Sequence, residues 1–326
     1  MRELISIVIP AYNEAEGILD FHKKLLMPAL KKHIKNYEIV YVNDGSTDQT
    51  IEKLSGLAVK DSNIKIVDLS RNFGKEIATT AGINETSGEA VIIMDADGQH
   101  PPEIIDQFIT KWQNGAQVVV GVRNSNQKEG WFKRGGSKMF YRLFNNLSDS
   151  QIVPRSTDYR LIDKDVREEF LKCSERNRIT RGLIDWLGFR RDYIEFDSPA
   201  RLAGEASYKT SQLIKLAVNS FISLSLKPLF LFGYIGILIT ALSLVFGIFM
   251  FIEQFLMGDP LGLNFTGSAL LGIFISFLVG LVLTAQGMMS IYLSHIHIQT
   301  QNRPIFVINK SSSINLEKEP NAKSKE

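Results

Sequence analysis

Residues 90–103 read Ala-Val-Ile-Ile-Met-Asp-Ala-Asp-Gly-Gln-His-Pro-Pro-Glu, and this stretch says most about the fold. The apolar run from Val91 to Met94 is typical of a buried strand, and two carboxylates, Asp95 and Asp97, follow it at once. Ligands of open α/β sheets bind at the carboxyl ends of the strands. Carboxylates there hold Mg²⁺ or Mn²⁺ together with phosphate oxygens and water. An acidic turn without a ligand would show the same two acids, so the rest of the sequence must decide.

The first 208 residues repeat this pattern of short apolar strands separated by amphipathic stretches. We expect strands at residues 5–9, 37–42, 64–68, 91–94 and 117–121. Such alternation predicts an α/β fold with a mostly parallel sheet and flanking helices. Asn13 with Glu16, and Ser46 with Gln49, have the spacing of capping boxes, which predicts helices directly after the first two strands.

Three of the strand-to-helix loops carry unusual polar residues and should open on one edge of the sheet. They are Pro-Ala-Tyr-Asn-Glu at 10–14, Asn-Asp-Gly-Ser-Thr-Asp at 43–48, and the acidic loop at 95–99. Neither the glycine pattern of dinucleotide folds nor that of nucleotide triphosphatases is present. A nucleotide held by carboxylates, an aromatic ring and a metal, in place of a glycine-rich loop, stays open.

Two long apolar runs, at residues 229–252 and 267–293, contain no charged side chain. Each is long enough to cross a bilayer core of roughly 30 Å as a helix. The link at 253–266 has no Lys or Arg, whereas lysines and arginines flank both runs, so both flanks are expected in the cytoplasm. A buried helical hairpin in a soluble protein is the alternative to this two-helix transmembrane anchor.

The composition excludes several classes of protein. A net charge of +2 and the lack of a basic-aromatic stripe argue against a nucleic-acid partner. The single cysteine, Cys173, rules out an intrachain disulfide and a Cys-rich metal site, as expected for a domain that faces the cytosol. The first apolar run is too short for a signal peptide.

Four motifs in fixed order make the sequence familiar: Ile-Val-Ile-Pro-Ala-Tyr-Asn-Glu, Val-Asn-Asp-Gly-Ser-Thr-Asp, Ser-Arg-Asn-Phe-Gly-Lys-Glu at 70–76, and Asp-Ala-Asp-Gly-Gln-His-Pro-Pro-Glu. The chain resembles family 2 glycosyltransferases, more narrowly the polyprenyl-phosphate glycosyltransferases, which include dolichol-phosphate mannose synthases and bactoprenol glucosyltransferases. The resemblance covers about residues 4–308 and both apolar runs.

This resemblance implies a domain plan. Residues 1–208 would form a cytoplasmic, Rossmann-like catalytic domain of the GT-A type, and 209–228 an amphipathic juxtamembrane helix, with a core helix of the soluble domain as the alternative. Residues 229–293 would form two transmembrane helices with a short external loop at 253–266. Residues 294–326 would form a cytoplasmic tail, disordered from about 310.

The resemblance also assigns site residues. The nucleotide-sugar contacts would be Pro10, Tyr12, Glu14, Asp44, Asp95, Ala96, Arg123, Arg134 and Arg201. The metal would be held by Asp97 and Gln99, with Asp95 as a third ligand or as a nucleotide or sugar contact, and the catalytic acids would be Asp158, Asp95 and Asp97. An ordinary turn at Asp44-Gly45 and a solvated basic face at the arginines are the alternatives. Lys209 is doubtful, because it follows Gly204 by five positions where the family motif has three.

The implied reaction is an inverting, metal-dependent transfer of a sugar to undecaprenyl phosphate at the cytoplasmic face of the cell membrane. UDP-glucose is the first expectation for the donor, UDP-N-acetylglucosamine the second and GDP-mannose the third. A lipid monophosphate is already anionic near pH 7, so Asp158 is expected to position the acceptor or a basic partner more than to remove a proton.

Two other functions remain open. A processive polysaccharide synthase would normally carry a Gln-x-x-Arg-Trp segment and more spans, and neither is visible in the sequence. A non-catalytic partner of a sugar-lipid flippase would have no need of the acids at 95, 97 and 158. Contacts with membrane lipids follow from the spans, and the small residues Gly267, Gly272 and Gly280 favour a homo-oligomer.

Overall fold

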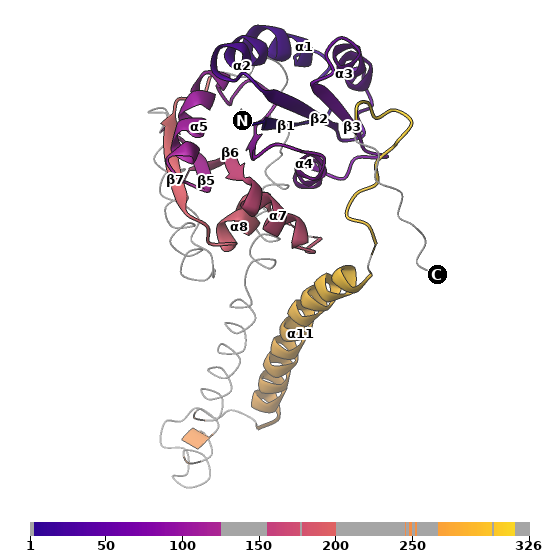
Figure 1. Ribbon diagram of the computed structural model, residues 1–326. Coiled ribbons are helices and arrows are strands. Elements are labelled where there is room, and N and C mark those ends of the chain that lie inside the picture. The colour runs from indigo at the N-terminus through magenta and orange to yellow at the C-terminus, as the bar shows by residue number, and fades with distance from the viewer. Residues whose placement is uncertain are drawn as a thin grey trace, which may run out of the picture. The chain divides into compact units, whose positions relative to one another are not determined.

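The computed structural model describes residues 3–124, 155–176, 178–199, 245, 248, 249, 252, 267–301 and 303–316. These residues belong to two compact units (Figure 1). The first holds the described residues up to 199 and those from 303 to 316, and the second holds those from 245 to 301. The first unit therefore draws on two distant parts of the chain.

A seven-stranded mixed sheet forms the centre of the first unit, in the order β3-β2-β1-β4-β6-β5-β7. The pairs β1·β2, β2·β3, β1·β4 and β5·β7 are parallel, whereas β6 runs antiparallel between β4 and β5. This confirms the predicted α/β fold with a mostly parallel sheet, and adds β6 and β7 to the five predicted strands. The strands are β1 (Ile5–Ala11), β2 (Tyr37–Asn43), β3 (Ile64–Asp68), β4 (Ala90–Ile93), β5 (Val118–Arg123), β6 (Ser156–Asp163) and β7 (Arg191–Phe196).

Both faces of this sheet are buried, which explains the continuous apolar runs of its strands. Because side chains alternate along a strand, Ile7 and Ile9 of β1 join one core cluster while Val8 joins the other. Helices α1, η1, α2, α3 and α5 supply the first cluster, and α4, α7 and α8 supply the second. Figure 1 shows α1, α2 and α3 on the opposite side of the sheet from α4.

The helices of this unit are α1 (Ile18–Asp20), η1 (Phe21–Leu26), α2 (Met27–His33), α3 (Thr50–Ala58), α4 (Lys75–Asn84), η2 (Pro102–Ile104), α5 (Ile105–Gln113), α7 (Lys164–Lys172) and α8 (Thr180–Trp186). The predicted capping boxes are wrong. Helix α1 begins after Gly17 and helix α3 after Gln49, and neither has a side-chain cap.

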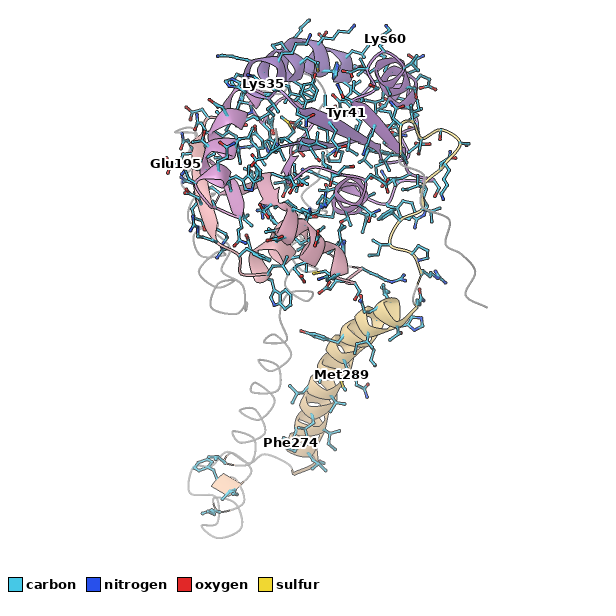
Figure 2. The ribbon with its side chains drawn as sticks, in the orientation of Figure 1. Lys35, Tyr41, Lys60, Glu195, Phe274 and Met289 are labelled. Carbon is cyan, nitrogen blue, oxygen red and sulfur yellow. The ribbon has the colours of Figure 1, made fainter. Side chains whose placement is uncertain are left out.

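The described part of the second unit includes the long helix α11 (Gly267–Thr300), which covers the second apolar run of the sequence. Its side chains Phe274 and Met289 are exposed and stand out from the helix in Figure 2. Within the described part of the chain, no helix combines the length and the apolar character needed to cross a membrane. The predicted juxtamembrane helix at 209–228, most of the span at 229–252 and the loop at 253–266 lie outside the described residues.

Residues 303–316, named the C-terminal strap below, pack against the edge strand β3. Ile314 pairs with Ile66 and Ile308 with Leu69, both in antiparallel bridges. The strap's apolar side chains Phe306, Ile308 and Leu316 contact the same core cluster as α4. The prediction of a tail disordered from about Lys310 is therefore corrected: residues up to 316 are held by bonds to β3, and those from 317 lie outside the described residues.

Candidate active site

The predicted site residues of the described chain gather at one edge of the sheet. Strands β1, β2 and β4 are parallel, so their carboxyl ends and the loops that follow them share this edge. Strand β6 is antiparallel to β4 and begins at the same edge, which brings Asp158 near the loop that carries Asp95. The fold thus joins acids that are far apart in the sequence.

The first two loops of this edge are tied to each other by side chains. The Asn13 amide donates to Ser46 Oγ at 3.0 Å, and the Thr47 amide donates to Asn13 Oδ1 at 2.9 Å. The Ala15 amide donates to Asp48 Oδ2 at 3.1 Å. Asn13 and Ser46, which the sequence predicted as helix caps, therefore bind the neighbouring loop, and Asn13 adopts a φ of 55° to do so.

Asp44, which directly follows β2, is buried at the junction of two loops. Its Oδ1 accepts from the Phe73 amide at 2.7 Å and its Oδ2 from the Gly74 amide at 2.9 Å. Burial raises the pKa of Asp44, and the two amides and Arg71 only partly offset this effect. The loop at 70–74 is thus fixed to the predicted nucleotide carboxylate.

Lys75, the first residue of α4, lies between two of the predicted catalytic acids. Its Nζ is 2.6 Å from Asp95 Oδ1 and 2.9 Å from Asp158 Oδ2. Burial opposes the charge on Asp158, but Lys75 and Arg181 hold the pKa of this carboxyl well below its usual range. Burial likewise opposes the charge on Lys75, and Asp158 and Asp95 hold its pKa above the usual range. Lys75 and Asp158 therefore stay ionised near neutral pH.

The acidic loop after β4 is held from within. The Asp95 amide donates to His100 Nδ1 at 2.9 Å, and the Gln99 amide donates to Asp97 Oδ1 at 3.0 Å. The His100 ring is buried and stacks on Tyr159 with 4.9 Å between ring centroids, and burial lowers the pKa of His100. A neutral His100 ring that accepts from the Asp95 backbone amide fixes the position of the backbone at the start of the acidic loop.

A small cavity of about 10 Å³ lies among residues that include Lys75, Glu76, Asp158, Arg160, Thr180 and Arg181. This volume is near the minimum for one water molecule. Two buried lining atoms, Arg160 Nε and Thr180 Oγ1, form no hydrogen bond with the described protein. The Glu76 carboxylate accepts from the Thr180 amide at 2.7 Å, and burial together with the charge of Asp158 raises the pKa of Glu76.

Comparison with known proteins decides which family this site belongs to. Residues 6–171 match the profile of Glycosyl transferase family 2, which spans β1 to the end of α7 and includes Asp44, Asp95 and Asp158. The chain belongs to glycosyltransferase family 2. It is therefore a glycosyltransferase, and the predicted family is confirmed.

Full-length relatives of this family 2 glycosyltransferase extend the match beyond the profile. YkcC of Bacillus subtilis strain 168, an uncharacterized glycosyltransferase, is 37% identical over 95% of this chain and 94% of its own. The SfII prophage-derived bactoprenol glucosyl transferase of Shigella flexneri is 36% identical over 94% of this chain and 98% of its own. Among solved structures, mannosyl-3-phosphoglycerate synthase from Rubrobacter xylanophilus aligns over 67% of this chain and 71% of its own with a TM-score of 0.47 at 16% identity, which is too weak a likeness for a functional argument.

Four further residues predicted for the family 2 site lie in the first and third loops or in the strand end beside them. Pro10 is at the end of β1, and Tyr12 is exposed in the loop that follows. The Glu14 amide donates to Thr50 Oγ1 at 2.9 Å, which ties the first loop to α3. Ala96 is buried between the two acids of the 95–99 loop.

The predicted arginines are only partly described. Arg123 ends β5, and its buried Nε forms no hydrogen bond with the described residues. Because β5 runs in the same direction as β4, Arg123 ends at the same sheet edge as the acids. Arg134 and Arg201, as well as Lys209, lie outside the described residues.

The donor set suits a hard cation in part. Asp97 and Gln99 offer a carboxylate and an amide oxygen on one short loop, whereas Asp95 is engaged by Lys75. No group of three or more His, Cys, Asp or Glu side chains suited to a metal occurs among the described residues. Such a set fits Mg²⁺ or Mn²⁺ whose remaining ligands are phosphate oxygens and water.

Lys75, Glu76 and His100 received no role from the sequence. All three stand within the quoted motifs, Lys75 and Glu76 in residues 70–76 and His100 after Gln99. The motif of residues 70–76 contributed to family recognition only, although its lysine begins the helix that follows the third strand. Its place between Asp95 and Asp158 depends on the pairing of β4 with β6.

Proposed function

We propose that this family 2 glycosyltransferase transfers a sugar from a nucleoside-diphosphate sugar to a polyprenyl phosphate at the cytoplasmic face of the cell membrane. The acceptor is supported by the full-length relative named bactoprenol glucosyl transferase, which is 36% identical over 94% of this chain. UDP-glucose is the first candidate donor, in keeping with that name, and UDP-N-acetylglucosamine is the second.

One structural observation supports the chemistry most directly. Lys75 lies 2.6 Å from Asp95 and 2.9 Å from Asp158, beside the loop that holds Asp44. A donor bound along Asp44 and Asp95 would present its anomeric carbon towards Asp158. In an inverting transfer, a phosphate oxygen of the acceptor forms a bond to that carbon as the bond to the diphosphate oxygen breaks.

Lys75 and Asp158 then serve to orient the reactants. The acceptor oxygen is already anionic near neutral pH, so no strong base is needed. Lys75 keeps Asp158 ionised, and the Asp158 carboxylate keeps the ammonium of Lys75 in place at the sheet edge. A fixed ammonium at this point also offsets negative charge where two phosphate groups would meet.

A divalent metal, Mg²⁺ or Mn²⁺, fits beside this arrangement. Asp97 and Gln99 would hold it, with Asp95 as the second carboxylate near it. When bound, it would neutralise charge on the leaving nucleoside diphosphate. The loop at 95–99 is suited to this because its backbone is fixed by His100 and by Ser198, whose Oγ donates to the Gln99 carbonyl at 3.0 Å.

The test is transfer of radiolabelled sugar by the purified full chain to undecaprenyl phosphate with Mg²⁺ or Mn²⁺. A donor panel of UDP-glucose, UDP-N-acetylglucosamine and GDP-mannose would identify the sugar through nucleoside-diphosphate release. We expect Asp97→Ala to abolish transfer without a change in the melting temperature. Asp20→Ala, which removes an exposed carboxylate paired with Lys24, is the matched control and should leave transfer unchanged. Full activity of Asp97→Ala would contradict the metal assignment. Hydrolysis of the donor without transfer of the sugar to undecaprenyl phosphate would contradict the proposed acceptor.

A further inference from the structure

The C-terminal strap makes an unusual set of contacts with one buried carboxylate, that of Asp68 at the end of β3. Asn309 Nδ2 donates to Asp68 Oδ2 at 3.2 Å, and Ser312 Oγ donates to the same oxygen. The backbone is engaged as well: the Asn309 amide donates to the Asp68 carbonyl at 2.7 Å, and the Asp68 amide donates to Ser313 Oγ at 3.0 Å. Asp68 is thus held from the strap side by main-chain and side-chain groups.

The other oxygen of Asp68 faces the neighbouring strand. Asn43 Nδ2 donates to Asp68 Oδ1 at 2.7 Å, and both side chains are buried. Asn43 Oδ1 in turn accepts from the Ser46 amide at 3.3 Å. Asn43 directly precedes Asp44, and Ser46 binds the Asn13 amide. A chain of hydrogen bonds therefore leads from the strap, through Asp68 and Asn43, to both nucleotide-side loops.

A second route runs along the backbone after β3. The Ser70 amide donates to the Val307 carbonyl of the strap at 2.9 Å, and Ile308 pairs with Leu69. The next residues, 71–74, supply the two amides that bind the Asp44 carboxylate. They also lie against Gly45, where an added Cβ would be only 2.3 Å from the Arg71 carbonyl carbon. The first route thus ends at Asn43 and Ser46, which flank Asp44 in the chain, and the second ends at the Asp44 carboxylate itself.

We propose that the C-terminal strap is a positioning element of the nucleotide site, in which Asn309 and Ser312 fix Asp68 and thereby the loop at 43–48. This inference rests on the proposed function, since it concerns the donor of that reaction. A carboxylate that accepts hydrogen bonds from donors on two sides keeps one orientation. Without the donors of the strap, the Asp68 carboxylate lacks hydrogen bonds on that side and can turn, which displaces Asn43 at the start of the loop at 43–48. The strap acts on donor binding and leaves the transfer step itself unchanged.

The test compares two variants of the full chain in detergent. Asn309→Ala/Ser312→Ala removes the two side-chain donors that the strap offers to the Asp68 carboxylate. Asn315→Gly removes a side-chain amide of the same strap that binds the Ala58 and Ile64 carbonyls, and glycine accepts the φ of 58° found there. For the double variant we expect about tenfold faster hydrogen exchange at 43–48 and about tenfold weaker binding of the nucleoside diphosphate with its metal, with kcat nearly unchanged. For Asn315→Gly we expect wild-type values in both measurements.

The outcomes separate the inference from the proposed function. The positioning role is overturned if hydrogen exchange at 43–48 is unchanged in the double variant. It is also overturned if the wild type binds UDP or GDP and the double variant binds it with the same affinity. A fall in kcat with an unchanged donor KM overturns it too. A wild-type chain that binds neither nucleotide overturns the proposed function and with it this inference. Ser312→Thr keeps the hydroxyl and should restore affinity when Asn309 is intact, which excludes simple unfolding as the cause.

Discussion

Lys75 resolves a conflict at the level of single residues. Asp95 and Asp158 would repel each other at the sheet edge, and a donor and an acceptor that both carry phosphate would add more negative charge. The ammonium of Lys75 contacts both carboxylates, and their negative charges offset the cost of burying it. A cation between the two acids can keep Asp95 in place on the donor side and Asp158 in place on the acceptor side.

We expect Lys75→Met to lower kcat/KM by about a hundredfold, because a pre-positioned charge in the site is lost and two carboxylates are left unpaired. Lys75→Arg keeps the charge and should retain more activity than Lys75→Met. Lys24→Met removes an exposed lysine from its pair with Asp20 and should have no effect. Steady-state transfer assays on the three variants check this, and equal activity of Lys75→Met and wild type would exclude a role for Lys75.

Glu38 is a buried carboxylate that serves stability and lies away from the site, near the beginning of β2. It accepts from Ser6 Oγ at 2.5 Å and from the Ser87 amide at 2.6 Å, and Lys65 Nζ is 2.9 Å away. Burial opposes its charge, but these partners together lower the pKa of Glu38 below its usual value. The charged form is therefore the one that the folded protein favours.

A lowered folded pKa gives stability that is present above the unfolded pKa and is lost as the pH falls through the folded pKa. We expect Glu38→Gln to lower the free energy of unfolding by about 2 kcal/mol at pH 7, since buried donors lose a charged acceptor. The difference from wild type should shrink below about pH 4. Thermal unfolding of both proteins between pH 3.5 and 7.5 measures this, and a difference that grows on acidification would contradict it.

At the level of elements, β6 decides whether a site forms. It inserts antiparallel between β4 and β5, and a register shift between Val120 and Val122 leaves Gly121 opposite its first residues. A Cβ at Gly121 would lie 2.9 Å from the Tyr159 carbonyl oxygen and 3.0 Å from a ring carbon of Phe196. The close approach of β5 and β6 beside Asp158 therefore requires glycine.

We expect Gly121→Ala to destabilise the protein by about 1–3 kcal/mol and to reduce transfer, because β6 must move away from β5 near Asp158. Gly56→Ala in α3 is the matched control, since a Cβ there would have no neighbour within 4 Å. This variant should gain about 0.5–1 kcal/mol from helix propensity and keep its activity. Denaturant unfolding and transfer assays test the pair, and a stabilising Gly121→Ala would refute the packing argument.

The sequence predicted the strands whose signal is local and missed what depends on pairing. Strands β1 to β5 have apolar runs that reveal them, whereas the position of β6 between β4 and β5 follows from contacts between distant segments. The capping boxes failed for a related reason: Asn13 and Ser46 have the correct spacing, but each finds a donor or acceptor on the neighbouring loop.

The same limit applies to the site. The strand pattern predicted that Asp44 and Asp95 lie at one edge of the sheet, because the carboxyl ends of parallel strands meet there. The place of Asp158 at that edge depends on the antiparallel strand β6, which the sequence did not predict. They could not reveal that Lys75 joins two of these acids, or that Asp68 is bound by residues 241 and 244 positions further along the chain. A single sequence carries no record of which distant polar groups pair.

At the scale of the whole molecule, the chain leaves its first unit and comes back to it, because the strap at 303–316 belongs to the same unit as residues 3–199. Both apolar runs therefore lie between two parts of one folded unit. If these runs cross a membrane, the chain must come back to the side from which it left, which requires an even number of crossings. This constraint is independent of the distribution of lysines and arginines and agrees with it.

Reporter insertions test this topology in the full chain. We expect a green fluorescent protein fused after Glu326 to fluoresce in cells, because it would remain in the cytoplasm. Alkaline phosphatase inserted after Pro260, in the link that has no Lys or Arg, should be active, because that enzyme needs the oxidising compartment outside. The same two reporters exchanged between the sites are the controls and should both be silent. With residues 3–199 in the cytoplasm, an active phosphatase at the C-terminus would require an odd number of crossings. That would separate the strap from β3 by a bilayer, which is incompatible with the pairing of Ile308 and Leu69.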